Sequence, residues 1–520
     1  MVGSLLFTTI STDTFIYIYV KKSIRSTTVI VMVFSMATRL IAFLFKIYLS
    51  RTVGAEALGL FSMGLAVFGL LTMVSSSGVP LTVSRKVAEA DALKMPSKAH
   101  GIVSSGLLIS ILFNALTIGL FFLLREQILS LFADQRAEGV VWILLPATFS
   151  TCIYNVLRSY FMGRKNYVLY SVTELVEEIL TVVAVLLLWS GSIATVQGDH
   201  ALALAFTVCD IICLVLIVIM YFCIGGRLRK PHESSQILKS STPITLMRLF
   251  TSLAATFTAI ILPNRLVSAG MSAPAATAVY GQAVGMAYPL LFAPLAITSA
   301  LSVVLLPEIA QLSITNYSSI APKVDKGMWY ILLVAGFCFT VYASMGKELG
   351  LMLFDDATAG KFVMFSAGMV FPLCMSQLTN TTMNSLGLEA RCFAHSMVGL
   401  VAMALCLWFL PSFLGIYALA VAQTAFFLIS FLLNTITLVR RKAMGLAHAK
   451  PFIWHTLGML VICTGTTLLR TALTPHLSVW PRGIICCAFC GILYALLLIL
   501  TKAVDLKKIC LLFAKRKKSK

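Results

Sequence analysis

Residues 35–50 read SMATRLIAFLFKIYLS and belong to an apolar run from about Thr27 to Ser50. The run has the roughly 20 residues that a helix needs to cross the hydrocarbon core of a bilayer. It nevertheless contains Arg39 near its centre and Lys46 two helical turns later. Because a cation at the middle of a membrane span costs at least ~2.5–3.5 kcal/mol, these two side chains need a polar environment within the membrane.

The composition of the whole chain is that of a membrane protein. Of its 520 residues, 59% are hydrophobic and 12% are charged, and the mean hydropathy is +0.95. Soluble domains are about 25% charged, and β-barrel strands alternate over about 10 residues. We therefore predict an all-α polytopic fold with about fourteen spans of roughly 20 residues. The expected spans are 27–50, 58–80, 101–124, 139–162, 168–190, 201–224, 243–263, 276–304, 327–346, 362–386, 392–410, 414–438, 452–470 and 483–501.

The sequence lacks the motifs of common catalytic and metal sites. No G-x-x-x-x-G-K-[ST] and no H-E-x-x-H occurs, and the loops leave no room for a soluble catalytic domain. The thirteen cysteines lie mostly in apolar runs without metal-ligand spacing. His395 and His455 have no nearby metal partner and are expected at the membrane interface. We expect no enzyme activity, no cofactor and no metal.

The positive charge is distributed unevenly along the chain. The net charge is +20, and most of the 40 Lys and Arg residues fall in alternate loops. These loops face the cytoplasm if the N-terminus does, so the pattern predicts a multi-pass protein of the cell membrane with both termini cytoplasmic. The basic loops and the tail 503–520 are expected to contact anionic lipid, and we expect no nucleic acid as a partner.

The two halves of the chain resemble each other weakly. RSYFMGRK (158–165) and NSLGLEAR (384–391) each place a glycine, followed by charge, at the cytoplasmic end of an even-numbered span. Six spans per half make the repeats parallel, and two such lobes usually enclose a central cavity. The alternative is a chance similarity among glycine-rich helices. The predicted organisation is an N-terminal extension 1–25, an N-lobe 26–224, a cytoplasmic linker 225–241, a C-lobe 242–439, two further helices in 440–502, and a basic tail 503–520.

Intramembrane cations are the leading candidates for substrate binding. Arg39 and Lys46 share a helix face with Ser35 and lie about 10 Å apart along the axis. The seventh span, TPITLMRLFTSLAAT (242–256), places Arg248 similarly. Since intramembrane cations are functional by default, we interpret Arg39, Lys46 and Arg248 as the wall of an anion-binding cavity.

Acidic residues of the fifth and sixth spans offer an alternative, in which the cations are paired structurally. Glu177 is the main candidate for a functional acid, as the partner of a cavity arginine or as a proton or cation site, and a structural salt bridge is equally open. Asp210 is expected to hydrogen-bond between helices. Arg158 is expected to be structural. The acids are Glu174, Glu177, Glu178 and Asp210.

Besides Ser35 and Glu177, four further residues are candidates for the lining or gate of the cavity. Arg51 and Arg265 follow the outer ends of the first and seventh spans. Gln282 and Pro289 lie in the eighth span, YGQAVGMAYPLLFAPLAITSA (280–300), where prolines are expected to bend the helix and small residues to allow close helix contact.

These stretches together resemble a known family. TRLIAFLFKIYLSRTVGAEALGLF (38–61), GVPLTVSRKVAE (78–89), TELVEEI (173–179), TPITLMRL (242–249) and AATAVYGQAVGMAYPLLFAPLAITSALSVVLLPEI (275–309) are similar to the stage V sporulation protein B family. That family belongs to the multidrug/oligosaccharidyl-lipid/polysaccharide (MOP) exporter superfamily, alongside the lipid II flippases.

The resemblance implies a function as well as a fold. It implies fourteen helices in two MATE-like six-helix lobes plus two C-terminal helices. It also implies that an undecaprenyl-pyrophosphate-linked saccharide, such as a lipid II-like peptidoglycan precursor, is moved to the outer leaflet of a bacterial membrane by alternating access. Cell-wall or spore-cortex synthesis would use this step.

The first span departs from the family pattern. Arg39, Lys46 and Arg51 fall on basic positions, but Lys46 stands where arginine is more usual, which keeps the charge and loses bidentate phosphate geometry. Ala42 replaces a usual glycine. The second span lacks the arginine of the Gram-negative lipid II flippases, so the grip on the substrate is expected to differ.

Two other functions remain open. A cation-coupled multidrug exporter of the MATE type would need acids in its cavity, where this chain offers cations. A non-transporting scaffold that recruits cell-wall synthases would not need the cavity charges at all.

Overall fold

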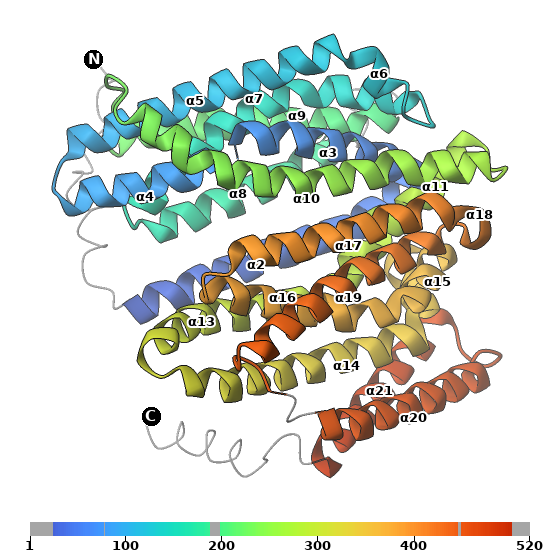
Figure 1. Ribbon diagram of the computed structural model, residues 1–520. Helices are drawn as coiled ribbons and strands as arrows, with labels where there is room; N and C mark the ends of the chain where they lie inside the picture. Colours follow the sequence, from blue (N-terminus) through green and yellow to red (C-terminus); the bar gives the residue numbers. More distant parts are fainter. Residues whose placement is uncertain (1–23, 77, 188–197, 446–448, 502–520) are drawn as a thin grey trace, which may run out of the picture. The chain divides into compact units, whose positions relative to one another are not determined.

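The computed structural model describes residues 24–76, 78–187, 198–445 and 449–501, and these ranges are helical without any strand. The predicted extension 1–25, except for its last two residues, and the predicted tail 503–520 lie outside the described residues. The helices (Figure 1) are α2 Ile24–Val53, α3 Ala55–Ser76, α4 Gly78–Ala92, α5 Pro96–Leu123, α6 Arg125–Leu129, α7 Arg136–Gly163, α8 Tyr167–Leu187, α9 Gly198–Cys223, α10 Ser234–Ser268, α11 Ala273–Tyr280, the π-helix η2 Gly281–Ala287, α12 Tyr288–Leu291, α13 Pro294–Thr315, the 3₁₀ turn η3 Tyr317–Ser319, α14 Ile320–Phe354, α15 Ala357–Ser366, the 3₁₀ turn η4 Ala367–Met369, α16 Val370–Ser385, α17 Glu389–Phe409, α18 Pro411–Leu414, α19 Tyr417–Arg440, α20 Ala449–Leu473 and α21 Val479–Leu500.

The described residues confirm an all-α, multi-pass membrane protein. Twelve of their helices are long and apolar enough to cross a membrane, or thirteen if the bent pair Ala273–Leu291 and Pro294–Ser302 is one span. The remaining expected span corresponds to α8, which has 21 residues. Its three glutamates, at positions 174, 177 and 178, make it the most charged of the expected spans.

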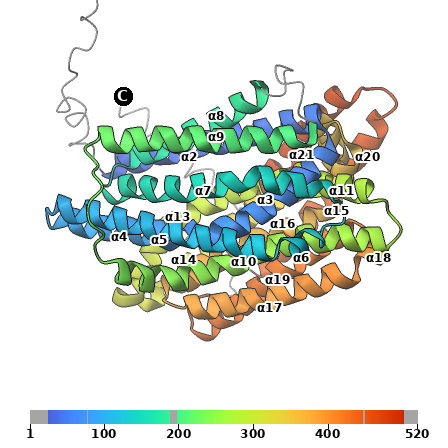
Figure 2. The same cartoon turned by 90° about the horizontal axis from the view of Figure 1, so that it is seen from above.

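The helices pack into two compact units. The first unit comprises Met1–Phe45 and Met63–Thr256, and the second comprises Lys46–Ser62 and Phe257–Lys520. The divisions fall inside α2, α3 and α10, so these helices contribute residues to both units. Within each unit the long helices lie roughly parallel (Figures 1 and 2). The predicted lobe limits stay a prediction.

The core of the first unit holds the ends of its helices together. Val83 and Val87, one turn apart on α4, are fully buried in a cluster that includes Tyr160 of α7 and Tyr221 of α9. The two tyrosine rings meet edge to face with centroids 5.1 Å apart. The Tyr221 hydroxyl donates to the Arg227 carbonyl at 3.1 Å, so the core also fixes the start of the loop after α9.

The same loop is fastened to α4 and α5 by charges and hydrogen bonds. The Glu233 carboxylate lies 2.6 Å from the Lys98 ammonium and 3.1 Å from that of Lys86. The Ser105 hydroxyl donates to the His232 carbonyl at 2.8 Å and accepts from the His232 amide at 2.7 Å. The predicted linker therefore begins as part of the first unit.

In the second unit, α20 and α21 are joined to α14 by a buried polar chain. The Tyr494 hydroxyl donates to the Leu333 carbonyl at 2.6 Å, so the His455 Nε2 atom, 3.0 Å away, donates to that hydroxyl. His455 is fully buried, and its expected place at the level of the membrane interface stays a prediction. His395 is half-buried, with its Nδ1 atom 2.8 Å from the Asn434 amide oxygen.

The eighth expected span, 276–304, is broken. It consists of α11, the π-helix η2 and α12, and then bends by 48° into α13. Pro289 and Pro294 stand at the starts of α12 and α13. Because proline lacks an amide hydrogen and clashes with the preceding turn, these two residues account for the break.

Close backbone contact fixes the start of this broken span against α3. A Cβ atom at Gly281 would overlap the Ala55 carbonyl oxygen, and one at Gly59 would overlap the Thr277 carbonyl oxygen. Such contact between small residues is how helices associate where lipid supplies no hydrophobic force between them.

We expect Gly281→Ala to lower the thermal stability of the purified protein, because overpacking a tight contact costs typically about 1–3 kcal/mol. Melting followed by tryptophan fluorescence measures this. Gly119→Ala is the matched control: a Cβ there meets nothing within 4 Å, and alanine favours a helix by about 1 kcal/mol. Equal melting temperatures for the two variants would contradict the close contact.

The Glu233 contact predicts a pH dependence of the loop after α9. The hydrogen bond from the Lys98 ammonium lowers the pKa of Glu233. A carboxyl whose pKa is lower in the folded state stabilises above its unfolded pKa, and this stabilisation is lost as pH falls through the folded pKa. We expect faster hydrogen exchange in this loop, beyond the intrinsic effect of pH, as the solution is acidified through that range.

The same contact can be tested at neutral pH. Glu233→Gln should speed tryptic cleavage of the loop, whereas Glu126→Gln, at an exposed site, should leave the cleavage rate unchanged. A loop equally resistant in wild type and Glu233→Gln would show that the ion pairs do not fasten it.

Candidate functional site

The α2 helix has an apolar exposed face and a basic exposed face, where exposed means not covered by protein. Leu40 and Leu44 are 58% and 55% exposed. Arg39 and Lys46 are exposed as well, and at 3.6 residues per turn they lie about 130° around the helix from the two leucines. Thr38 and other residues of the remaining side are buried. The cations are thus separated from the face best suited to lipid.

The α10 helix repeats this separation. Leu246 and Leu253 are 50% and 40% exposed, and the exposed Arg248 lies about 150° around the helix from them. On the packed side, the Thr256 hydroxyl donates to the Ala66 carbonyl at 2.9 Å, which joins α10 to α3. The Arg248 side chain therefore points away from the exposed leucines.

Charge and exposure together favour a polar surrounding for these cations. Arg39 and Arg248 belong to the first unit, and Lys46 belongs to the second. Among the described residues, Arg39 has no ion-pair partner. An unpaired guanidinium in contact with hydrocarbon would be costly, and an anionic ligand would neutralise it by charge-assisted hydrogen bonds.

The acids of the first unit are engaged within that unit. Arg158 pairs with Glu174 at 2.8 Å, and its guanidinium lies 3.9 Å above the Tyr170 ring. Asp210 accepts a hydrogen bond from the Thr151 hydroxyl at 2.6 Å, which confirms the expected bond between helices. Arg158 and Asp210 hold α7 against α8 and α9.

Glu177 is half-buried in the first unit. Its carboxyl is near the Tyr154 hydroxyl and Arg158, and its backbone carbonyl accepts from the Thr181 hydroxyl at 2.9 Å. Its functional role stays a prediction. In the described part of the chain, no group of three or more His, Cys, Asp or Glu side chains is arranged to hold a metal ion.

The two arginines considered for the mouth bind helix ends in the second unit. Arg51 donates from Nε to the Leu353 carbonyl at 2.8 Å and from Nη2 to the Met352 carbonyl, where α14 ends and its dipole is negative. Arg265 donates to the Trp408 carbonyl at 2.8 Å, and its guanidinium lies 4.3 Å from the centre of the Trp408 ring. Both contacts tie helix ends together, and a role of these arginines in a gate stays a prediction.

The other gate candidates lie at helix junctions. Gln282, in η2, donates to the Asp356 carboxylate at 2.7 Å. The same carboxylate caps the start of α15 by accepting from the amides of the following turn. Pro289 is the second residue of α12, and Ser35 is half-buried on α2. Gln282 thus joins the broken span to α15.

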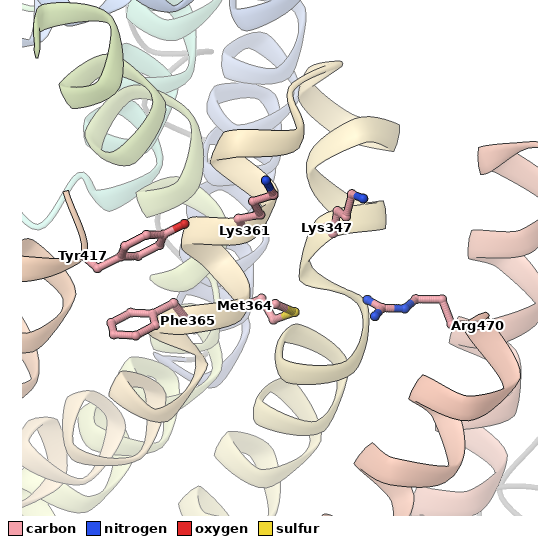
Figure 3. A pocket seen from close by; sticks show the side chains of 6 residues that line it. All are labelled: Lys347, Lys361, Met364, Phe365, Tyr417 and Arg470. Atoms are coloured by element: carbon pink, nitrogen blue, oxygen red, sulfur yellow. The ribbon is translucent and has the colours of Figure 1, made fainter. Parts of the chain in front are cut away.

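A further cluster of cations was not predicted. Three basic side chains and three apolar or aromatic ones surround a cavity of about 320 Å³ in the second unit (Figure 3). In the sequence these three cations belong to the loops that carry few basic residues, on the side opposite to the basic loops. The one sequence signal for the cluster is that two of the cations directly follow glycines. The lining residues are Lys347, Lys361, Arg470, Met364, Phe365 and Tyr417.

Comparison with known sequences gives the family. Residues 24–313 match the family described as polysaccharide biosynthesis protein. Stage V sporulation protein B of Bacillus subtilis (strain 168) is 24% identical over 402 residues, which cover 73% of this chain and 76% of that relative. Sporulation protein YkvU of the same organism is 22% identical over 303 residues, 56% of this chain and 66% of that relative.

Comparison with solved structures gives the fold. The lipid II flippase MurJ in an inward closed conformation has a TM-score of 0.71 at 12% identity, with 91% of this chain and 99% of that chain covered. An inward-facing multidrug resistance MATE family transporter of the MOP superfamily has a TM-score of 0.60 at 13% identity, covering 78% and 94%. At such low sequence identity, the structural similarity establishes the fold alone. The fold is the MATE-like fold expected from the sequence.

The two exposed faces of α2 and α10 predict a pattern of chemical labelling. In a variant depleted of native cysteines, Arg39→Cys and Arg248→Cys should react in membrane vesicles with a charged, water-soluble maleimide. Leu40→Cys and Leu246→Cys should not, because a thiol in hydrocarbon neither ionises nor meets the reagent. Gel shift measures the labelled fraction, and the reverse pattern would contradict the assignment of faces.

Proposed function

Because the chain belongs to the polysaccharide biosynthesis protein family, we propose that it is a flippase for a lipid-linked saccharide with a pyrophosphate group. The observation that carries this proposal is the exposure of Arg39 and Arg248 on helix faces turned away from exposed leucines. Guanidinium groups bind phosphate by bidentate, charge-assisted hydrogen bonds. Lys46, on the same face of α2 as Arg39, would add a third cation.

The relatives support a particular substrate class and setting. Stage V sporulation protein B and MurJ bear names that refer to sporulation and to lipid II. We propose a lipid II-like peptidoglycan precursor as the substrate here, moved to the outer leaflet by alternating access in cell-wall or spore-cortex synthesis. The apolar tail would stay in the bilayer while the headgroup crosses, and no covalent chemistry is required.

The direction of transport rests on the proposed topology. In the second unit, one end of the helices carries Lys323 and Lys326 at the start of α14, Arg391 at the start of α17 and Arg440 at the end of α19. We propose that this end faces the cytoplasm, together with both termini. The saccharide would then enter from the side of the basic loops.

A drug exporter for organic cations is less well supported. Such a protein would need accessible carboxylates, whereas Glu174 is paired with Arg158 and Asp210 accepts from Thr151. The exposed cation Arg39 would repel a cationic drug. The charge of the described faces therefore favours an anionic substrate.

A flipping assay in proteoliposomes tests the proposal. We expect the wild type to move a fluorescent polyprenyl-pyrophosphate saccharide across the bilayer. Arg39→Gln and Arg248→Gln should each slow this at least about tenfold, because a hydrogen bond to a charged group contributes about 1.5–3 kcal/mol. Lys326→Gln, which changes an exposed cation near the start of α14, should keep the wild-type rate.

Other results would reject the proposal. Full flipping by both arginine variants would return these cations to a structural role. Export of an organic cation, unaffected by the arginine variants, would favour the drug exporter. A scaffold would be favoured by two results together: the protein transports nothing, and cells that depend on it survive with the arginine variants.

A further inference from the structure

The cluster of cations in the second unit depends on a close contact between two helices. On α14 and α15 a Cβ atom at Gly350 would overlap Gly360, and one at Gly346 would lie 2.6 Å from the Met364 amide nitrogen. Lys347 and Lys361 directly follow Gly346 and Gly360 in the sequence. The helix contact therefore brings two exposed lysines to one place, with the side chains directed to the same cavity (Figure 3).

The buried carboxylate beside Arg470 is already engaged with arginines. Glu348 is buried and lies 3.1 Å from Arg470 and 3.8 Å from Arg482. The Nη1 atom of Arg470 also donates to the Ser344 carbonyl at 3.0 Å. Among the described residues, neither Lys347 nor Lys361 has an ion-pair partner.

Positive charge gathers around this cavity. Lys347, Lys361 and Arg470 line it, and the Nε atom of the neighbouring Arg482 is buried without a hydrogen-bond acceptor. Like charges held together by a rigid backbone contact repel one another. An anion in the cavity would relieve this repulsion and supply acceptors.

The other walls of the cavity are apolar or aromatic. Met364 and Phe365 are 38% and 52% exposed, and the Tyr417 hydroxyl points toward Lys361 (Figure 3). The volume of about 320 Å³ lies at the lower limit of small-molecule sites, about 300–1,000 Å³. Cations beside exposed apolar side chains suit an amphiphile whose anionic group is attached to a hydrocarbon chain.

The position of the cavity across the membrane fits the same class of ligand. Lys347 lies near the end of α14, Lys361 near the start of α15 and Tyr417 at the start of α19. These are the helix ends opposite to Lys326 and Arg440. The ends of spanning helices lie at the level of lipid headgroups, so a phosphate there could bind while its chain remains in the bilayer.

We propose that Lys347, Lys361 and Arg470 form a binding site for the phosphoryl group of an anionic lipid at the membrane surface opposite to the basic loops. The ligand is a bilayer phospholipid or a polyprenyl phosphate, which share this chemistry. The site differs from the faces of α2 and α10 and does not depend on the function proposed for them.

Native mass spectrometry of the full-length protein tests the site. The probes are phosphatidylglycerol, undecaprenyl phosphate and, as a zwitterionic control, phosphatidylcholine. We expect at least one anionic probe to bind more tightly than phosphatidylcholine. In the double variant Lys347→Gln/Lys361→Gln its affinity should fall about tenfold, which corresponds to about 1.4 kcal/mol. The tighter of the two anionic probes identifies the source of the phosphoryl group.

Matched variants separate this site from other cations. Lys326→Gln/Lys442→Gln removes two exposed lysines at the other end of the unit and should lower the affinity less than Lys347→Gln/Lys361→Gln does. Equal affinity of wild type and Lys347→Gln/Lys361→Gln, or phosphatidylcholine bound as tightly as both anionic probes, would overturn the proposal.

A measurement on the wild type alone guards against a variant that misfolds. In nanodiscs containing phosphatidylglycerol or undecaprenyl phosphate, Lys347 and Lys361 should be acylated several-fold more slowly than in phosphatidylcholine nanodiscs, and this slowing should exceed that of Lys442 in the basic loops. Equal acylation of Lys347 and Lys361 in all three would also overturn the proposal.

Discussion

The cost of placing a cation in hydrocarbon is the constraint on which this protein is built. Most of the chain satisfies it by keeping charge in the loops. Inside the membrane the cations are either paired, as Arg158 is with Glu174, or turned away from the exposed leucines, as Arg39 and Arg248 are. Arg39 is neither buried nor paired with an acid among the described residues. The proposed anionic substrate would neutralise its charge.

The way in which the helices pack also follows from the lipid around them. Lipid chains are as apolar as leucine, so helices associate through small residues and polar bonds. The broken span touches α3 at Gly281, and α14 touches α15 at Gly350 and Gly360. Hydrogen bonds from Tyr494 and Arg51 join further helices to α14. The second glycine contact also brings Lys347 and Lys361 to one cavity, which links helix packing to the proposed lipid site.

The sequence was sufficient for features that depend on local pattern. Continuous apolar runs predicted the spanning helices, and a seven-residue spacing placed Arg39 and Lys46 on one exposed face. The charge in α8 was visible in its three glutamates. The expectation that Asp210 bonds between helices followed from one carboxyl on an otherwise apolar span.

Features that depend on distant parts of the chain could not be predicted. The partner of Arg51 is 302 residues away and that of Arg265 is 143 residues away, so their contacts with helix ends could not be foreseen. The partner of His455, Tyr494, likewise lies on another helix. Lys347, Lys361 and Arg470 come together only when α14, α15 and α20 have packed.

Recognition of the pyrophosphate by Arg39 and Arg248 is best tested by measuring affinity with and without the charge on the ligand. Native mass spectrometry can compare a polyprenyl-pyrophosphate saccharide with a neutral polyprenyl saccharide on wild type and on Arg39→Gln/Arg248→Gln. We predict that the wild type prefers the pyrophosphate ligand and that the double variant loses this preference while its binding of the neutral ligand is unchanged. A preference of equal size in both proteins would contradict recognition of the substrate by these two arginines.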